Sequence, residues 1–179
     1  MRIKQLGLIV LSAILLSGCA GLLNKLPILA VDSTSSLLGQ QLTYQLQWQD
    51  GKDSGQMLLV LAHQNDSVQL VGLSNTSVSL FSLQRDNDGD HLQKSYFYRK
   101  LPDAHQLLNQ LLMAYYSEAF IQQQLGKEWQ LVETAQARQW LYRGEQRLMI
   151  TFAAQQLTIE SPKQQLRLHI SAQQRADAL

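Results

Sequence analysis

The chain has 179 residues, 45% of them hydrophobic and 16% charged, and a formal net charge of +1 at pH 7. Its near-neutral balance, without a basic stripe, argues against a nucleic-acid-binding protein, because such proteins present strongly basic faces. The single cysteine excludes an internal disulfide. The length fits one domain with its own hydrophobic core.

The N-terminus has the order of an export signal. Arg2 and Lys4 precede an apolar run over residues 6–16, and the small residues Ser17 and Gly18 follow it. This order is typical of a secretory signal, and the run is shorter than the roughly 20 residues of a transmembrane helix. We therefore predict a signal peptide over residues 1–18. The cysteine behind it is either a modified lipoprotein cysteine or an incidental residue behind an ordinary signal.

Residues 16–19, Leu-Ser-Gly-Cys, resemble the lipobox of bacterial lipoproteins. The resemblance implies that Cys19 is acylated and becomes the first residue of the mature protein, so that the membrane is its partner through this residue. Two or more acyl chains hold a protein stably on a membrane. Residue 20 is Ala and not the Asp that retains lipoproteins in the inner membrane of enteric-type bacteria. The resemblance thus implies the periplasmic face of the outer membrane.

The mature chain begins with a segment that is expected to link the anchor to the domain. Residues 19–37 are expected to be the lipidated cysteine and a tether, because Pro27 and the Asp, Ser and Thr residues over 32–36 interrupt any apolar pattern. Part of this tether is compatible with a short helix. The globular domain is expected over residues 38–172. Without the signal peptide the chain carries 13 basic and 14 acidic side chains, so its charge still gives no reason to expect nucleic acid as a partner.

Alternating patterns predict strands in the first half of the domain. Apolar residues alternate with polar ones from Leu42 to Trp48, which is typical of a strand with one buried and one solvated face. Residues 57–62 are continuously apolar, which favours a strand covered on both faces. Turn-forming residues punctuate the chain between the runs. The first five strands are expected over residues 42–48, 57–62, 68–73, 78–83 and 91–99.

The period changes after residue 102. Asp103 can cap a helix, and Gly126 suits its end. Between them, leucines and Tyr115 fall on one face at helical spacing. One helix, or a pair of short ones, is expected up to Leu125.

Short strands return after the helical segment. They are expected over residues 129–133, 138–142, 147–152, 157–160 and 166–170, and residues 173–179 form a polar tail. Nine or ten antiparallel strands in one sheet tend to curl. We therefore expect a mainly β (α+β) fold: a strongly curved antiparallel sheet or half-barrel with the helical segment as a lid.

Several short motifs resemble a known family. They are Val-Gly-Leu-Ser over residues 71–74, Leu-Phe-Ser-Leu over 80–83 with Asp86 and Gly89 beyond it, and Leu-Pro over 101–102 before a leucine-rich helix. They resemble a family of short bacterial outer-membrane lipoproteins of unknown function. That family is often encoded beside aryl-polyene and fatty-acid-like biosynthetic genes.

A more remote resemblance covers roughly residues 40–172. The order of lipobox, strand meander, helical lid and returning strands resembles LolB, the outer-membrane lipoprotein receptor, and its periplasmic partner LolA. The resemblance implies an open half-barrel whose cavity accepts acyl chains, and a periplasmic carrier or envelope complex as a partner. One feature departs from LolB, which exposes a leucine in a turn between two early strands. The corresponding turn, residues 74–77, is polar here.

Motifs for catalysis and metal binding are absent from the sequence. The segment Gly72-Leu73-Ser74-Asn75 lacks the closing glycine of a nucleophile elbow. The acidic segment over residues 86–90 starts like a calcium loop, but His91 and Phe97 stand where Gly and Glu are required. The four histidines show no metal-ligand spacing. We therefore expect no cofactor, no metal and no enzymatic activity.

Apolar and aromatic residues are the remaining candidates for function, because ligand pockets are mainly apolar with a few polar anchors. Arg99, Arg138 and Arg143 are candidate headgroup anchors. The candidate cavity lining comprises Tyr44, Leu46, Trp48, Leu58, Val60, Tyr96, Tyr98, Leu111, Tyr115, Trp140, Tyr142, Ile150 and Phe152.

Three functions are compatible with these features. The first is an outer-membrane lipoprotein that binds, carries or places an acyl or polyene lipid. The second is an accessory lipoprotein that docks onto an envelope complex without a small ligand. The third, an esterase or thioesterase, requires a Ser, His and acid within hydrogen-bond reach.

Overall fold

The structure, a computed structural model, describes residues 26–98, 100–154, 156–162 and 166–172. The predicted signal peptide, Cys19, the first part of the tether, Arg99 and the polar tail lie outside these ranges. Among the helices of the described residues, none has the length and apolar character needed to span a membrane.

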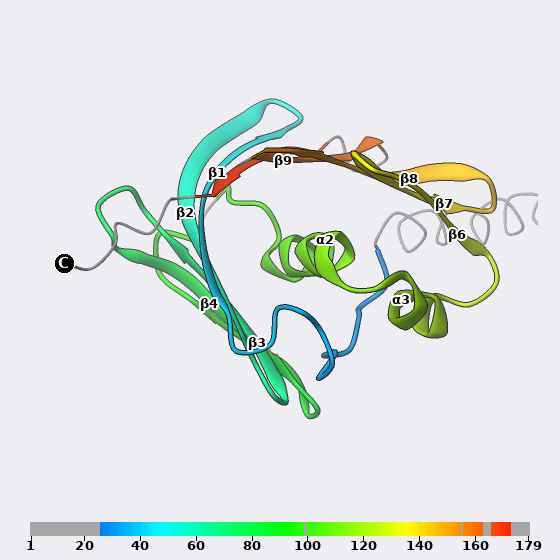
Figure 1. Cartoon of the computed structure of the whole chain (residues 1–179). Helices are drawn as coiled ribbons and strands as arrows, with labels where there is room; N and C mark the ends of the chain where they lie inside the picture. The colour runs from blue at the N-terminus through cyan, green and yellow to red at the C-terminus, as the bar shows by residue number, and fades with distance from the viewer. Residues whose placement is uncertain (1–25, 99, 155, 163–165, 173–179) are drawn as a thin grey trace, which may run out of the picture.

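A single ten-stranded antiparallel sheet forms most of the molecule, in the order β5-β4-β3-β2-β1-β10-β9-β8-β7-β6. It is strongly curved, and β5 and β6 form its two edges, so that it does not close (Figure 1). The prediction of a mainly β fold with a curved antiparallel sheet is therefore confirmed. The strands are β1 (Gln41–Asp50), β2 (Asp53–Gln64), β3 (Ser67–Leu73), β4 (Ser79–Asp86), β5 (Gly89–Lys94), β6 (Trp129–Thr134), β7 (Ala137–Tyr142), β8 (Glu145–Ala153), β9 (Gln156–Ser161) and β10 (Leu166–Ala172).

The inner face of the sheet carries the core. Alternate residues of β1 and β2 are buried, and Leu46 faces Met57 across the two strands. In β2 this alternation leaves Leu58 and Val60 half-buried on the outer face. The prediction that this strand is covered on both faces was wrong, because a single layer packs against the sheet and covers its inner side (Figure 1).

Two helices follow β5, α2 (Ala104–Tyr115) and α3 (Glu118–Leu125). The sequence left open one helix or a pair, and the structure has the pair. Asp103 caps α2 by accepting a hydrogen bond from the Gln106 N–H, and Ser117 does the same for α3. α2 lies in the hollow of the sheet (Figure 1). All residues from Gln106 to Ala114 are buried, so α2 is a core helix and not a lid across an empty hollow.

The described part of the predicted tether, residues 26–37, is packed in the domain, and we call it the N-terminal strap. Its Leu26, Leu29 and Leu37 are buried in the core. Four of its backbone N–H groups donate to side chains of the helical segment: those of Leu26, Leu29, Ala30 and Asp32 donate to Gln106, Asn109, Gln124 and Tyr116. The expected tether therefore does not extend to residue 37, because polar helix side chains bind this backbone and leucines anchor it.

Two glycines let aromatic rings lie flat on the inner face. A Cβ placed on Gly72 would lie 2.2 Å from the ring of Phe81, its cross-strand partner. A Cβ on Gly55 would lie 2.3 Å from the ring of Trp48, also its cross-strand partner. Both glycines are therefore required by close approach of a buried ring, and Trp48 packs on backbone instead of facing open space.

The fifth strand is shorter than expected, since β5 ends at Lys94. The loop after it exposes two aromatic side chains, Tyr96 (78% exposed) and Phe97 (64%). Tyr96 therefore does not lie on the inner face, which corrects its placement in the predicted cavity wall.

Candidate functional site

A small pocket opens at the C-terminal end of α2. We call it the inner pocket; its volume is about 180 Å³. Its lining comes from four strands, the turn between β8 and β9 and the last residue of the helix: Tyr44, Tyr115, Phe152, Ala153, Ala154, Gln156, Leu157 and Ile170. Three of these, Tyr44, Tyr115 and Phe152, were predicted as cavity residues. The pocket is partly open to solvent at the turn between β8 and β9, where Ala153 and Ala154 are exposed.

Two tyrosines form one wall of the inner pocket. The hydroxyl oxygens of Tyr44 and Tyr115 lie 2.6 Å apart and share a hydrogen bond, and the two rings stack with centroids 6.5 Å apart. Burial raises the pKa of both hydroxyls above the ordinary tyrosine value. Both therefore stay protonated at physiological pH, and the wall offers hydroxyl groups without charge.

Arg138 of β7 closes the C-terminal end of α2 beside this pocket. Its Nη1 donates to the carbonyl oxygens of Ala114 and Tyr116 at 3.0 and 2.8 Å, and its Nε donates to Glu133 at 2.8 Å. The last carbonyls of a helix have no partners within the helix and carry partial negative charge. This predicted headgroup anchor therefore binds backbone and a carboxylate.

A buried polar network surrounds the N-terminal half of α2. Arg85 of β4 is 2% exposed, and its guanidinium forms two hydrogen bonds with Asp90, at 2.6 and 2.8 Å. Its Nη1 donates to the carbonyl of Leu29 in the N-terminal strap and to Asn109 of α2. Hydrogen bonds from Arg85 hold the pKa of Asp90 below its ordinary value. The network therefore ties sheet, helix and strap together.

Asp90 also contacts His105, whose Nδ1 lies 2.7 Å from a carboxylate oxygen. The described hydrogen bonds of His105 and Asp90 join no serine or threonine hydroxyl to this pair. Thr158 and His169 form a hydrogen bond elsewhere, on the outer face of the sheet, and their described contacts include no carboxylate. Within the described ranges no group of three His, Cys, Asp or Glu side chains is placed to hold a metal ion.

A second polar contact joins the strap to the sheet. Tyr116, directly after α2, lies 3.0 Å by its hydroxyl from Nε2 of His63, and the same hydroxyl accepts the N–H of Asp32. His63 is 1% exposed. Burial lowers the pKa of its imidazole, because a charged ring is poorly solvated there.

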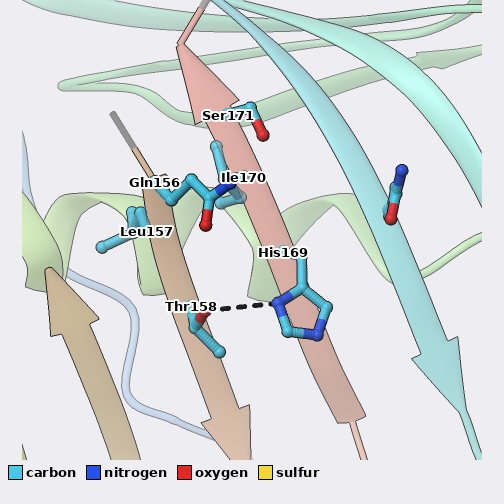
Figure 2. A pocket seen from close by; sticks show the side chains of 7 residues that line it. Gln156, Leu157, Thr158, His169, Ile170 and Ser171 are labelled. Carbon is cyan, nitrogen blue, oxygen red and sulfur yellow. Dashed lines mark hydrogen bonds between the residues drawn. The ribbon is translucent and has the colours of Figure 1, made fainter. Parts of the chain in front are cut away.

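The outer face of the sheet carries a second, polar pocket of about 290 Å³, shown in Figure 2. Side chains of β9 and β10 surround it, and the hydrogen bond between Thr158 and His169 crosses it (Figure 2). Gln47 of β1, Gln156 and Ser171 add polar groups. We assign this pocket no function.

The predicted cavity residues fall into three groups. Leu46, Trp48, Leu111, Trp140 and Ile150 are buried in the core, and Tyr98 packs against it. Tyr44, Tyr115 and Phe152 line the inner pocket.

The others lie elsewhere. Leu58 and Val60 are on the outer face and Tyr96 is exposed. Tyr142 is half-buried beside Trp129, and its hydroxyl donates to Glu128. Arg143 also pairs with Glu128 on the surface, away from any described pocket residue.

Sequence reasoning missed the residues that organise the site. Arg85 and Asn109 were not singled out, although polar residues at Gln106, Asn109 and Gln110 interrupt an otherwise leucine-rich helix. A polar residue among helical core positions is a signal for a buried hydrogen-bond partner. Leu157 and Ile170 were predicted in strands but not in the pocket.

The chain matches a known family model. Residues 41–174 match the sequence profile of the family described as "Protein of unknown function (DUF3261)". A search of curated proteins found no match. The match covers three quarters of the chain and includes all ten strands and both helices.

Proposed function

The chain belongs to the DUF3261 family, and we propose that it is a lipid-anchored lipoprotein on the periplasmic face of the outer membrane that binds an acyl or polyene chain. The Leu-Ser-Gly-Cys segment supports the anchor. The curved, unclosed sheet around a helix supports a half-barrel related to LolA and LolB.

The inner pocket is the observation on which lipid binding rests. It lies where α2 ends, between the helix and the inner face of the sheet, and it is partly open. Its walls are aliphatic and aromatic, with two tyrosine hydroxyls and the Gln156 amide as polar groups, the usual composition of a small-molecule site. A chain that enters here meets Phe152, Leu157 and Ile170, and the last two belong to the hydrophobic core.

The anchor is tested by replacing Cys19 with Ser in the full chain. We expect the variant to remain an uncleaved precursor that incorporates no labelled palmitate. Incorporation of palmitate into this variant would contradict the lipoprotein assignment.

Lipid binding is tested on the mature chain with Cys19→Ser, exported to the periplasm by a cleavable signal that carries no lipobox. Native mass spectrometry should find a co-purified lipid, and N-phenylnaphthylamine, an uncharged apolar dye, should fluoresce on binding. Ala154→Trp should obstruct the pocket mouth and abolish both signals. Ala135→Trp is the matched control, because Ala135 is exposed in the equivalent turn between β6 and β7. If the unblocked chain carries no lipid and binds no dye, the proposal fails.

A second function is favoured by a different observation. The N-terminal strap and α2 fill most of the hollow, while Val78 is 48% exposed and Tyr96 and Phe97 are exposed as well. The Ser95 N–H donates to the Leu80 carbonyl, which brings the loop after β5 to the start of β4 beside Val78. Such a cluster suits docking onto an envelope complex. If docking is the function, the lipidated protein should form specific cross-links to envelope proteins, and Phe97→Ser should remove them. The mature chain should then bind no lipid.

A further inference from the structure

Among the residues that the structure describes, none with a charged side chain lines the inner pocket. The lining consists of two tyrosines, a phenylalanine, a glutamine, two alanines and two aliphatic residues. A carboxylate or phosphate transferred from water into such a lining loses its hydration and gains no counter-ion, which is costly. The lining therefore disfavours anionic ligands, in addition to favouring apolar ones.

The helix end beside the pocket further disfavours an anionic ligand. Tyr115 is the last residue of α2, so the pocket lies at the negative end of the helix dipole. Arg138 is the cation bonded to the carbonyls on either side of Tyr115, and its charge is balanced by Glu133 and by those carbonyls. An anion in the pocket would thus meet a helix C-terminus and a guanidinium that already has partners.

The tyrosine pair provides a limited number of hydrogen bonds. With the two oxygens 2.6 Å apart, one hydroxyl donates to the other. The accepting hydroxyl keeps its own proton, which is free to donate to one further acceptor. Tyr44 is 4% exposed and Tyr115 is half-buried, so this donor faces the pocket in a largely desolvated setting, where a missing partner is costly.

We infer that the inner pocket binds the end of an uncharged hydrophobic ligand that carries one hydrogen-bond acceptor, such as an ester carbonyl or an alcohol, and disfavours the free carboxylate or phosphate of the same chain. The donor is the free hydroxyl proton of the Tyr44–Tyr115 pair. This inference rests on the proposed function and specifies the ligand of that same site.

The test compares three ligands of equal chain length: a fatty methyl ester, the fatty alcohol and the fatty acid. Each competes with N-phenylnaphthylamine on the mature chain with Cys19→Ser at pH 8, where the acid is ionised. We expect the ester and the alcohol to displace the dye at about tenfold lower concentration than the acid, since one charge-free hydrogen bond and avoided desolvation together exceed about 1.4 kcal/mol.

The double variant Tyr44→Phe/Tyr115→Phe removes both hydroxyls and keeps both rings. It should weaken the ester and the alcohol about fivefold, the value of one hydrogen bond of about 1 kcal/mol, and leave the acid unchanged. Tyr142→Phe is the matched control, because its hydroxyl contacts Glu128 away from the pocket, and it should change none of the three. Thermal unfolding shows whether each variant is folded.

Two outcomes would overturn the inference. If the acid displaces the dye as well as the ester does, or if the double variant weakens all three equally, the pocket does not select uncharged ligands, although acyl-chain binding stands. If none of the three displaces the dye, acyl-chain binding itself fails and the inference fails with it.

Discussion

The two ends of α2 are held in place by different chemistry. Around the N-terminal half, Arg85, Asp90, Asn109 and the N-terminal strap form a buried network in which the charged groups have charged or polar partners. At the C-terminal end, two neutral tyrosines and aliphatic side chains surround a partly open space. A buried charge tolerates little movement, because losing one partner leaves an unpaired ion. Neutral walls can separate at lower cost, so ligand entry is physically reasonable at the second end.

The strongest test of this contrast removes the charge at the first end. Arg85→Leu removes the guanidinium partner of Asp90 and the donor to the Leu29 carbonyl, and it leaves Asn109 Oδ1 with the Leu29 N–H alone. We expect a loss of about 3–5 kcal/mol in the free energy of unfolding, the usual cost of breaking a buried ion pair, measured by urea denaturation. Arg167→Leu is the control, because Arg167 pairs with Glu160 on the exposed outer face and such pairs contribute about 0–1 kcal/mol. Equal effects of the two variants would show that the network does not hold the helix.

A smaller effect is expected at the second end. Arg138→Gln removes the donor that serves the last carbonyls of α2. Hydrogen bonds to a charged group contribute about 1.5–3 kcal/mol, so we expect a loss in that range by urea denaturation, together with weaker dye binding because Tyr115 is less well positioned. Arg143→Gln, which alters an exposed pair with Glu128, should leave both measurements unchanged. If the Arg138→Gln variant is as stable as the wild type and binds dye normally, the hydrogen bonds of Arg138 do not position the pocket.

The smallest effect concerns pH and the contact between strap and sheet. Burial lowers the pKa of His63 in the folded protein, so below its ordinary value of about 6.5 the unfolded chain takes up a proton that the folded chain does not. Stability should therefore fall as the pH is lowered from 7 to 5.

In His63→Gln, whose amide can still reach Tyr116, this decrease should be smaller. His169→Gln, on the exposed outer face, should keep the wild-type dependence. Thermal melting at several pH values measures both, and identical slopes in all three proteins would exclude His63 as the source.

The sequence predicted most of the fold because its signals are local. Alternation in β1, the glycine and asparagine turns and the Asp103 cap each depend on residues a few positions apart. Nine or ten strands and one helix or a helical pair follow from such patterns, and curvature follows from strand number. Local patterns failed where burial depends on a distant segment. The apolar run over residues 57–62 gives no information on how many layers cover it. The N-terminal strap contains no pattern that reveals the helix side chains that bind its backbone.

The order of elements, the class of fold, the lipobox-like segment and the absence of catalytic motifs can be read from the amino-acid sequence. Which aromatic residues meet depends on the three-dimensional packing. Tyr44 and Tyr115 are 71 positions apart and share a hydrogen bond, whereas Tyr96, equally aromatic, is exposed beyond the end of β5. The same holds for Arg85, whose partners lie in the strap, in α2 and in β5. The physical reason is that a pocket or a buried ion network arises from packing between distant segments, which short-range periodicity does not encode.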